Sequence, residues 1–134
     1  MRYVRYLHSE LEFWGILLSD ELIQPMTAAP YAKGVPLCQP VPLGAVRLLP
    51  PCQPGKIVAV GKNYQDHIDE FKGQRPANPI IFLIPDTALI GPDEPIILPE
   101  PDLSDEVDFE GELALLIVKT ASRIKARDYR EYVL

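Results

Sequence analysis

Residues 107–118 have the sequence Val-Asp-Phe-Glu-Gly-Glu-Leu-Ala-Leu-Leu-Ile-Val, and this stretch decides how the fold is interpreted. Its first half alternates between apolar and charged residues, and its second half is apolar throughout. Alternation with a period of two is typical of a strand with one polar face. The sequence therefore predicts a strand on which Asp108, Glu110 and Glu112 share one face.

Three carboxylates on one face of a strand repel one another, because neighbours at i and i+2 lie about 7 Å apart. A divalent cation removes this repulsion, since Mg²⁺ or Mn²⁺ binds carboxylate oxygens and keeps waters that a substrate can replace. Gly111 lies between the two glutamates and leaves space for a ligand or a neighbouring chain. The alternative interpretation is an ordinary solvated strand face, and both interpretations stay open on spacing alone.

The composition is that of a globular chain with an acidic charge balance. Its 134 residues are 47% apolar, which is enough for a domain with a core. The net charge is −6 and basic residues are not clustered, so neither nucleic acid nor a membrane surface is an expected partner. The sequence shows no membrane-spanning run and no signal peptide, so we expect a cytoplasmic protein. Cys38 and Cys52 lack the spacing of a metal site and are expected to be reduced.

The N-terminal part of the chain predicts a small β domain. Residues 3–7 and 13–18 are rich in aromatic and branched side chains and predict a hairpin, and residues 21–24 predict a third strand. Eight prolines interrupt residues 25–54, where Ala45–Leu49 is the best strand candidate. We therefore expect a small β domain with a Pro-rich connector at residues 1–50, and a second domain at 51–134.

A second informative stretch follows a predicted buried strand at residues 56–60. After Gly61, Asn63 is a candidate cap for a short helix that carries His67 and Glu70 on one face, at i and i+3. A carboxylate beside a histidine fixes the tautomer of the imidazole and favours its protonated form, which suits a general base. The alternative is an exposed helical pair with no chemical role.

Three further elements are expected in the second domain. Residues 79–83 and 96–98 predict short strands, with turns rich in proline and glycine between them. Asp128 and Glu131 have the spacing of a capping box and predict a helix over residues 128–134.

Taken together, these motifs resemble the fumarylacetoacetate hydrolase family. The matching segments are residues 56–64 with His67 and Glu70, then 82–83, 85–95 and 107–117. The first 55 residues resemble the small N-terminal β domain of some bacterial members. The resemblance implies a mainly β fold with short helices (α+β), in which an incomplete mixed β-sheet catalytic fold follows the small β domain.

The resemblance also implies roles for three pairs of residues: His67 and Glu70 as the catalytic dyad that activates water, Lys62 and Asn63 as substrate-binding residues, and Glu110 and Glu112 as metal ligands. The implied cofactor is Mg²⁺ or Mn²⁺, with Ca²⁺ as a further option. In the family the third metal ligand belongs to a later motif, which is absent from this chain. Ile84 stands where the family usually has a lysine after Phe-Leu.

The implied chemistry is hydrolysis, decarboxylation or isomerisation at C–C bonds of 2-oxo or 2,4-dioxo acids, such as acylpyruvates. The expected partners are this small-molecule acid and a second subunit, either in a homodimer or as a full-length homologue. Because the third metal ligand is absent, we expect the 134-residue chain alone to have little or no activity. The alternative function is a truncated, non-catalytic remnant that binds a subunit or a metal ion.

Overall fold

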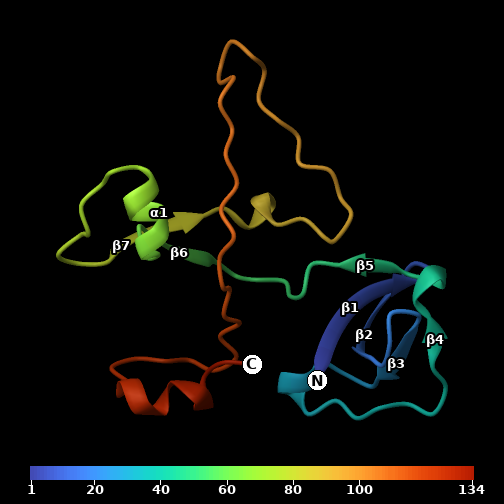
Figure 1. Ribbon diagram of the computed structural model, residues 1–134. Helices are drawn as coiled ribbons and strands as arrows, with labels where there is room; N and C mark the ends of the chain where they lie inside the picture. Colours follow the sequence, from blue (N-terminus) through green and yellow to red (C-terminus); the bar gives the residue numbers. More distant parts are fainter. The chain divides into compact units, whose positions relative to one another are not determined.

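A computed structural model describes residues 1–134 (Figure 1). The chain forms two compact units, one made of Met1–Cys52 and Gly91–Leu134 and the other of Gln53–Ile90. Strands and short helices are the only regular elements, and every strand pair is antiparallel. The predicted class, mainly β with short helices, is confirmed, whereas the domain boundary at residue 50 stays a prediction.

The first unit is built on a five-stranded antiparallel sheet with the strand order β4-β3-β2-β1-β5. The strands are β1 (Arg2–His8), β2 (Leu11–Leu17), β3 (Leu22–Met26), β4 (Val41–Pro42) and β5 (Arg47–Leu49). β1 and β2 form the predicted hairpin, and its two turn residues, Ser9 and Glu10, both have positive φ. A two-residue turn with positive φ matches the twist of the flanking strands, which fixes the register of the hairpin.

The core of this sheet is small and centred on Tyr6 and Ile23, which are 1% and 0% exposed. The Tyr6 ring stacks on Phe13, with ring centroids 5.7 Å apart. Gly15 lies against both core residues, since an added Cβ would come within 2.3 Å of Ile23 Cγ2 and 3.1 Å of Tyr6 Cε1. Burial also raises the pKa of the Tyr6 phenol above its ordinary value. The bare backbone of Gly15 therefore allows side chains of β1 and β3 to approach β2 closely.

The second unit contains a two-stranded antiparallel sheet and one helix. Its strands are β6 (Ile57–Gly61) and β7 (Ile80–Ile84), and the helix α1 (Gln65–Glu70) lies between them in the sequence. Both strands were predicted within one residue of these bounds, and the short helix that carries His67 and Glu70 was predicted without stated bounds. α1 buries Ile68, which is 4% exposed.

Four short 3₁₀ helices complete the regular structure: Pro30–Ala32, Leu43–Ala45, Asp86–Ala88 and Ala126–Glu131. The α-helix predicted over residues 128–134 is therefore wrong in type and in bounds. The N-cap is Lys125, which makes no side-chain cap hydrogen bond, and Asp128 lies inside the helix. The Asp128 N–H donates to the Lys125 carbonyl at 2.9 Å, the short-range pattern of a 3₁₀ turn. None of the helices has the length and apolar character needed to cross a membrane.

The strands predicted at residues 96–98 and 107–118 are wrong. Residues 107–118 make only one isolated antiparallel bridge, from Ile117 to Val133. Beside this bridge, Val118 N–H donates to the Tyr132 carbonyl at 2.9 Å. An extended segment becomes a strand only where a neighbour supplies hydrogen bonds along its length. Within residues 107–118 a β-bridge forms at Ile117, and no ladder of successive bridges forms along the segment.

Candidate functional site

The turn between β6 and α1 carries two of the candidate substrate-binding residues. Lys62 has a left-handed backbone, with φ 52°, which side chains other than glycine adopt mainly in turns. Tyr64, with an extended backbone, is the N-cap of α1 and makes no side-chain cap hydrogen bond. The predicted cap role of Asn63 is therefore wrong, because Tyr64 occupies the position directly before the first helical residue.

The side chain of Lys62 lies beside the segment that follows α1. Its Nζ is 4.0 Å from the position that a Cβ would occupy on Gly73. The Gly73 N–H donates to the Ile68 carbonyl at 2.8 Å, at the C-terminal end of the helix. A cation is favourable near the carbonyls that end a helix. Lys62 Nζ thus lies near the segment that ends α1, and substrate binding by Lys62 and Asn63 stays a prediction.

The predicted dyad lies on α1, where His67 and Glu70 occupy neighbouring positions three residues apart. His67 is half-buried and Glu70 is exposed. The imidazole ring of His67 lies against the Phe71 ring, with centroids 4.9 Å apart and planes tilted by 55°. Phe71 was not among the predicted site residues, although its i+4 spacing from His67 is the signal that could have found it. The helix thus gives the imidazole one apolar neighbour and one carboxylate on the same side of α1.

The two candidate metal ligands, Glu110 and Glu112, lie in the segment that forms no strand, and both are exposed. A Cβ added to Gly111 between them would meet no atom within 4 Å, so the expected close neighbour at this glycine is not observed. The described residues contain no group of three or more His, Cys, Asp or Glu side chains that could hold a metal ion. Carboxylate oxygens are the donors that Mg²⁺ and Mn²⁺ prefer. Glu110 and Glu112 are two such side chains in one extended segment, and no third candidate ligand lies with them.

The candidate residues are divided between the two units. His67 and Glu70 belong to Gln53–Ile90, as do Lys62 and Asn63, whereas the glutamate pair belongs to the unit that contains Gly91–Leu134. The structure therefore places His67 and Glu70 in the same unit as the turn that precedes α1. Glu110 and Glu112 are near one another only because one residue separates them in the sequence.

Comparison with known proteins places both parts of the sequence. A family model described as "Fumarylacetoacetate (FAA) hydrolase C-terminal" matches residues 56–134, which is more than half of the chain. The chain belongs to the fumarylacetoacetate hydrolase family. A second model, described as "Rv2993c-like, N-terminal", matches residues 1–51 of this family member. The predicted family is thus confirmed.

Solved structures of family members share the fold of this chain. The 5-carboxymethyl-2-hydroxymuconate delta-isomerase from Mycobacterium smegmatis has a TM-score of 0.84 and 34% identity, covering 100% of this chain and 52% of that one. The 2-hydroxyhepta-2,4-diene-1,7-dioate isomerase from Mycobacterium marinum has a TM-score of 0.82 and 31% identity, covering 100% and 51%. The chain therefore spans about half the length of these solved relatives.

Curated relatives are similar over the larger part of this chain and about a third of their own length. Protein Rv2993c from Mycobacterium tuberculosis is 48% identical over 93 residues, which are 69% of this chain and 34% of that protein. The mitochondrial oxaloacetate tautomerase Fahd2a from Rattus norvegicus is 45% identical over 86 residues, which are 64% and 27% of the two chains. The relatives of this fumarylacetoacetate hydrolase-family chain thus include proteins named as isomerases and as a tautomerase.

Proposed function

We propose that this chain carries the proton-transfer dyad and two metal ligands of an enzyme that isomerises or tautomerises a 2-oxo or 2,4-dioxo acid. The observation that supports this proposal most is the match over the whole chain to a solved structure named as an isomerase, at 34% identity. The tautomerase named among the curated relatives acts, by its name, on oxaloacetate, which is a 2-oxo acid. Hydrolysis and decarboxylation of the same substrate class are the competing outcomes.

The dyad suits the proton transfer that these reactions need. Isomerisation and tautomerisation take a proton from one atom of the substrate and deliver a proton to another. In the enol-to-keto direction the proton leaves the enol oxygen, and the carbon beside the carbonyl receives one. In this proposal the imidazole of His67 accepts the first proton and returns it to the second atom, and the Glu70 carboxylate on the same face of α1 orients the ring. The Phe71 ring lies against the imidazole, with ring centroids 4.9 Å apart, and helps to fix its orientation. A positioned base of this kind typically contributes about 10²–10⁴-fold to the rate.

The donor chemistry of Glu110 and Glu112 fits a hard divalent cation. We propose these two carboxylates as ligands for Mg²⁺ or Mn²⁺, which would supply Lewis-acid polarisation of the substrate's keto oxygen. Two protein carboxylates bind Mg²⁺ weakly, because this ion loses its hydration water reluctantly. We therefore expect weak metal binding by the chain on its own.

Metal binding and proton transfer are tested separately. Mn²⁺ should raise the melting temperature of the chain, and the shift should shrink in Glu110→Gln while Glu106→Gln, in the same acidic segment, keeps it. If Mn²⁺ has no effect on the wild-type chain, the metal-ligand assignment fails in this protein. Because we expect the chain on its own to have little activity, the enol-to-keto conversion of oxaloacetate, followed by ultraviolet absorbance with Mn²⁺ present, should exceed the buffer rate only slightly and return to the buffer rate in His67→Ala. Equal rates for both proteins would contradict the dyad.

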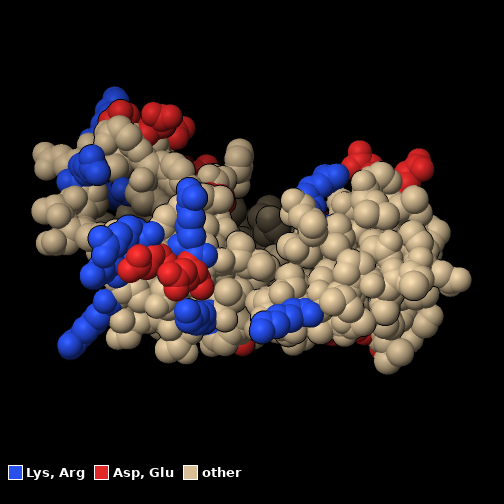
Figure 2. All heavy atoms as spheres, turned by 90° about the horizontal axis from the view of Figure 1, so that it is seen from below, with Lys and Arg blue, Asp and Glu red and all other residues tan.

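A second candidate function, a subunit-binding module without turnover, is favoured by exposed apolar residues in the second unit. Val58, Ile81 and Leu83 on β6 and β7 are 54%, 65% and 69% exposed. Apolar side chains that are exposed next to one another mark interaction sites. Figure 2 shows one face of the chain on which Lys, Arg, Asp and Glu leave broad areas uncovered, and these areas include uncharged polar as well as apolar residues. Association in a homodimer or with a full-length homologue is therefore the proposal that competes with turnover.

A further inference from the structure

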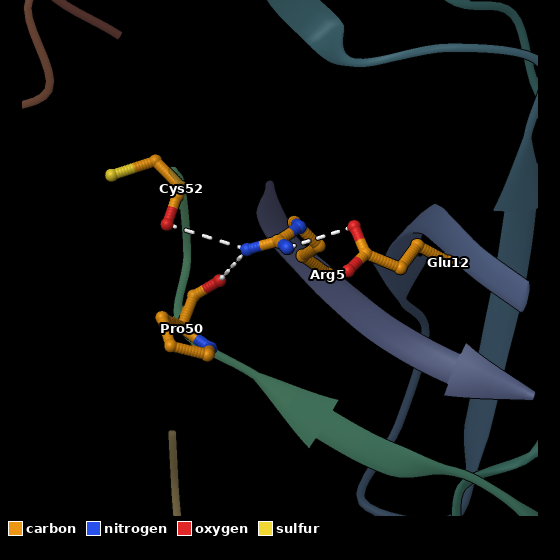
Figure 3. Close-up of polar contacts among 4 residues, drawn as sticks. All are labelled: Arg5, Glu12, Pro50 and Cys52. Carbon is orange, nitrogen blue, oxygen red and sulfur yellow. Dashed lines mark hydrogen bonds and ion pairs between the residues drawn. The ribbon is translucent and has the colours of Figure 1, made fainter. Parts of the chain in front are cut away.

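The side chain of Arg5, on β1, holds the chain where it leaves the first unit. Arg5 is buried, with 7% of its surface exposed, and its guanidinium contacts three acceptors (Figure 3). Nη1 donates to the carbonyl oxygens of Pro50 at 3.2 Å and Cys52 at 3.3 Å, and Nη2 donates to Glu12 Oε2 at 2.8 Å. Hydrogen bonds from an ionised donor are stronger than neutral ones. Arg5 thus ties residues 50–52, which lead into the Gln53–Ile90 unit, to the N-terminal hairpin.

The chain returns to the first unit at Gly91, and a second arginine holds it there. Glu94 accepts from Arg47 Nη1 at 3.0 Å through Oε1, and from the Gly91 N–H at 2.9 Å through Oε2. Gly91 is buried, and an added Cβ would lie 3.1 Å from the Leu48 carbonyl oxygen and 3.4 Å from Pro50 Cδ. The returning segment therefore packs directly against β5 and the residue that follows it.

Both holding points share one strand. Arg47 and Leu48 belong to β5, and Pro50, an acceptor of Arg5, follows the end of that strand directly. β5 pairs with β1, so that Arg5 lies opposite Leu49. The outgoing segment (residues 50–52) and the returning segment (residues 91–94) are thus held at the same edge of the N-terminal sheet.

We propose that Arg5 and the Arg47–Glu94 pair form a clamp that joins the two ends of the Gln53–Ile90 unit on the N-terminal sheet. The hydrogen bond to Glu12 lies within the β1–β2 hairpin and would by itself be a local contact. The carbonyls of Pro50 and Cys52 lie outside the hairpin, so the hydrogen bonds that they accept from Arg5 fix the position of the connector. Joining the ends of a long segment removes chain entropy that the segment would otherwise keep. The clamp thereby assigns the N-terminal domain a task, which is to fix the two points between which the segment that bears His67 and Glu70 begins and ends. This inference is independent of the reaction that the protein catalyses.

Hydrogen exchange of the intact chain, followed by mass spectrometry, tests the clamp. Arg5→Lys keeps the charge but loses the forked pair of donors. Amides of the outgoing segment, at Cys52 and Gln53, and of the returning segment, at Gly91 and Glu94, should all exchange about tenfold faster, while amides of β2 and β3 stay unchanged. The matched control is Arg2→Gln, which breaks the exposed Arg2–Asp20 pair at 3.5 Å and should leave both segments unchanged.

The decisive observation is the response of the segment that was not altered. Glu94→Gln weakens the ion pair with Arg47 that holds the returning segment, and it leaves Arg5 in place. This variant therefore tests the clamp even if Arg5→Lys unfolds the sheet. Faster exchange at Cys52 and Gln53 in Glu94→Gln supports the clamp. The reversed pair Arg47→Glu with Glu94→Arg should restore slow exchange at Cys52 and Gln53 only, because arginine at position 94 cannot accept from the Gly91 N–H. Changes confined to residues 91–94 in Glu94→Gln, or an equal effect of Arg2→Gln, would overturn it.

Discussion

At Gly15 a single missing side chain decides how closely three strands pack. The nearest atoms to an added Cβ belong to Ile23 on β3, at 2.3 Å, and to Tyr6 on β1, at 3.1 Å. Both neighbours are among the least exposed residues of the chain, so neither has free space to move into. The core of the N-terminal sheet is therefore sensitive to volume at this position.

We expect Gly15→Ala to lower the free energy of unfolding by about 1–3 kcal/mol, because the new methyl group forces Ile23 from its place. Urea denaturation followed by the fluorescence of Trp14 measures this loss, since Trp14 is adjacent in β2. Gly44→Ala is the control, because a Cβ at Gly44 meets nothing within 4 Å. Equal stabilities of the two variants would show that the packing at Gly15 is not tight.

Also at the scale of the residue, the contacts of the buried Arg5 could not be predicted from the sequence. The acceptors of Arg5 lie 45 and 47 residues away in the chain, at Pro50 and Cys52. An arginine in a strand pattern gives no sign of such partners, since local spacing carries no information on distant contacts. By contrast, His67 and Glu70 were found from the sequence because helical spacing of three residues already places them side by side.

At the scale of elements, α1 ends in a motif that normally contains glycine. Lys72 has a left-handed backbone with φ 50°, and its N–H donates to the Asp69 carbonyl at 3.0 Å. The next amide, of Gly73, donates to the Ile68 carbonyl at 2.8 Å. These two hydrogen bonds form a Schellman motif, in which glycine is preferred at the left-handed position because it has no Cβ. Lysine at this position has a Cβ and therefore carries backbone strain that glycine would not have.

Lys72→Gly should therefore stabilise the end of α1 by about 0.5–1 kcal/mol. Slower hydrogen exchange of the Gly73 amide, whose acceptor is the Ile68 carbonyl, reports this gain. Lys72→Ala is the matched variant, because it removes the lysine side chain and keeps the left-handed strain. If alanine slows exchange as much as glycine does, the lysine side chain and not the backbone causes the effect.

The strands that were predicted correctly are those whose partners are close in sequence. β1 and β2 are joined by a two-residue turn, and β6 and β7 lie on either side of α1. The strand expected at residues 107–118 has an equally clear period of two, but its only pairing is the bridge of Ile117 with Val133. A period of two shows that a segment can lie in a sheet, and it does not show which segment will pair with it. The metal-ligand prediction at Glu110 and Glu112 depended on that strand, so its geometry could not be derived from the pattern.

At the scale of the whole molecule, β6 and β7 present one apolar face to solvent. Val58 pairs with Leu83, and Val60 pairs with Ile81, so these four side chains project from the same face of the two-stranded sheet. Their exposed fractions lie between 37% and 69%. A two-stranded sheet is marginal in water unless a further layer covers one face. This face is therefore one of the apolar surfaces that the chain presents for association.

We expect the purified chain to associate through this face, and the combined change Val58→Thr with Ile81→Thr to shift it toward the monomer at the same concentration. Threonine keeps the branched shape that suits a strand and removes apolar surface. Light scattering coupled to size-exclusion chromatography gives the mass of the particle in solution.

Leu18→Thr with Val35→Thr is the control, because these residues are similarly exposed, at 54% and 58%, but belong to the first unit. A wild-type chain that is monomeric at high concentration, or a control that dissociates equally, would remove the support for a subunit-binding function.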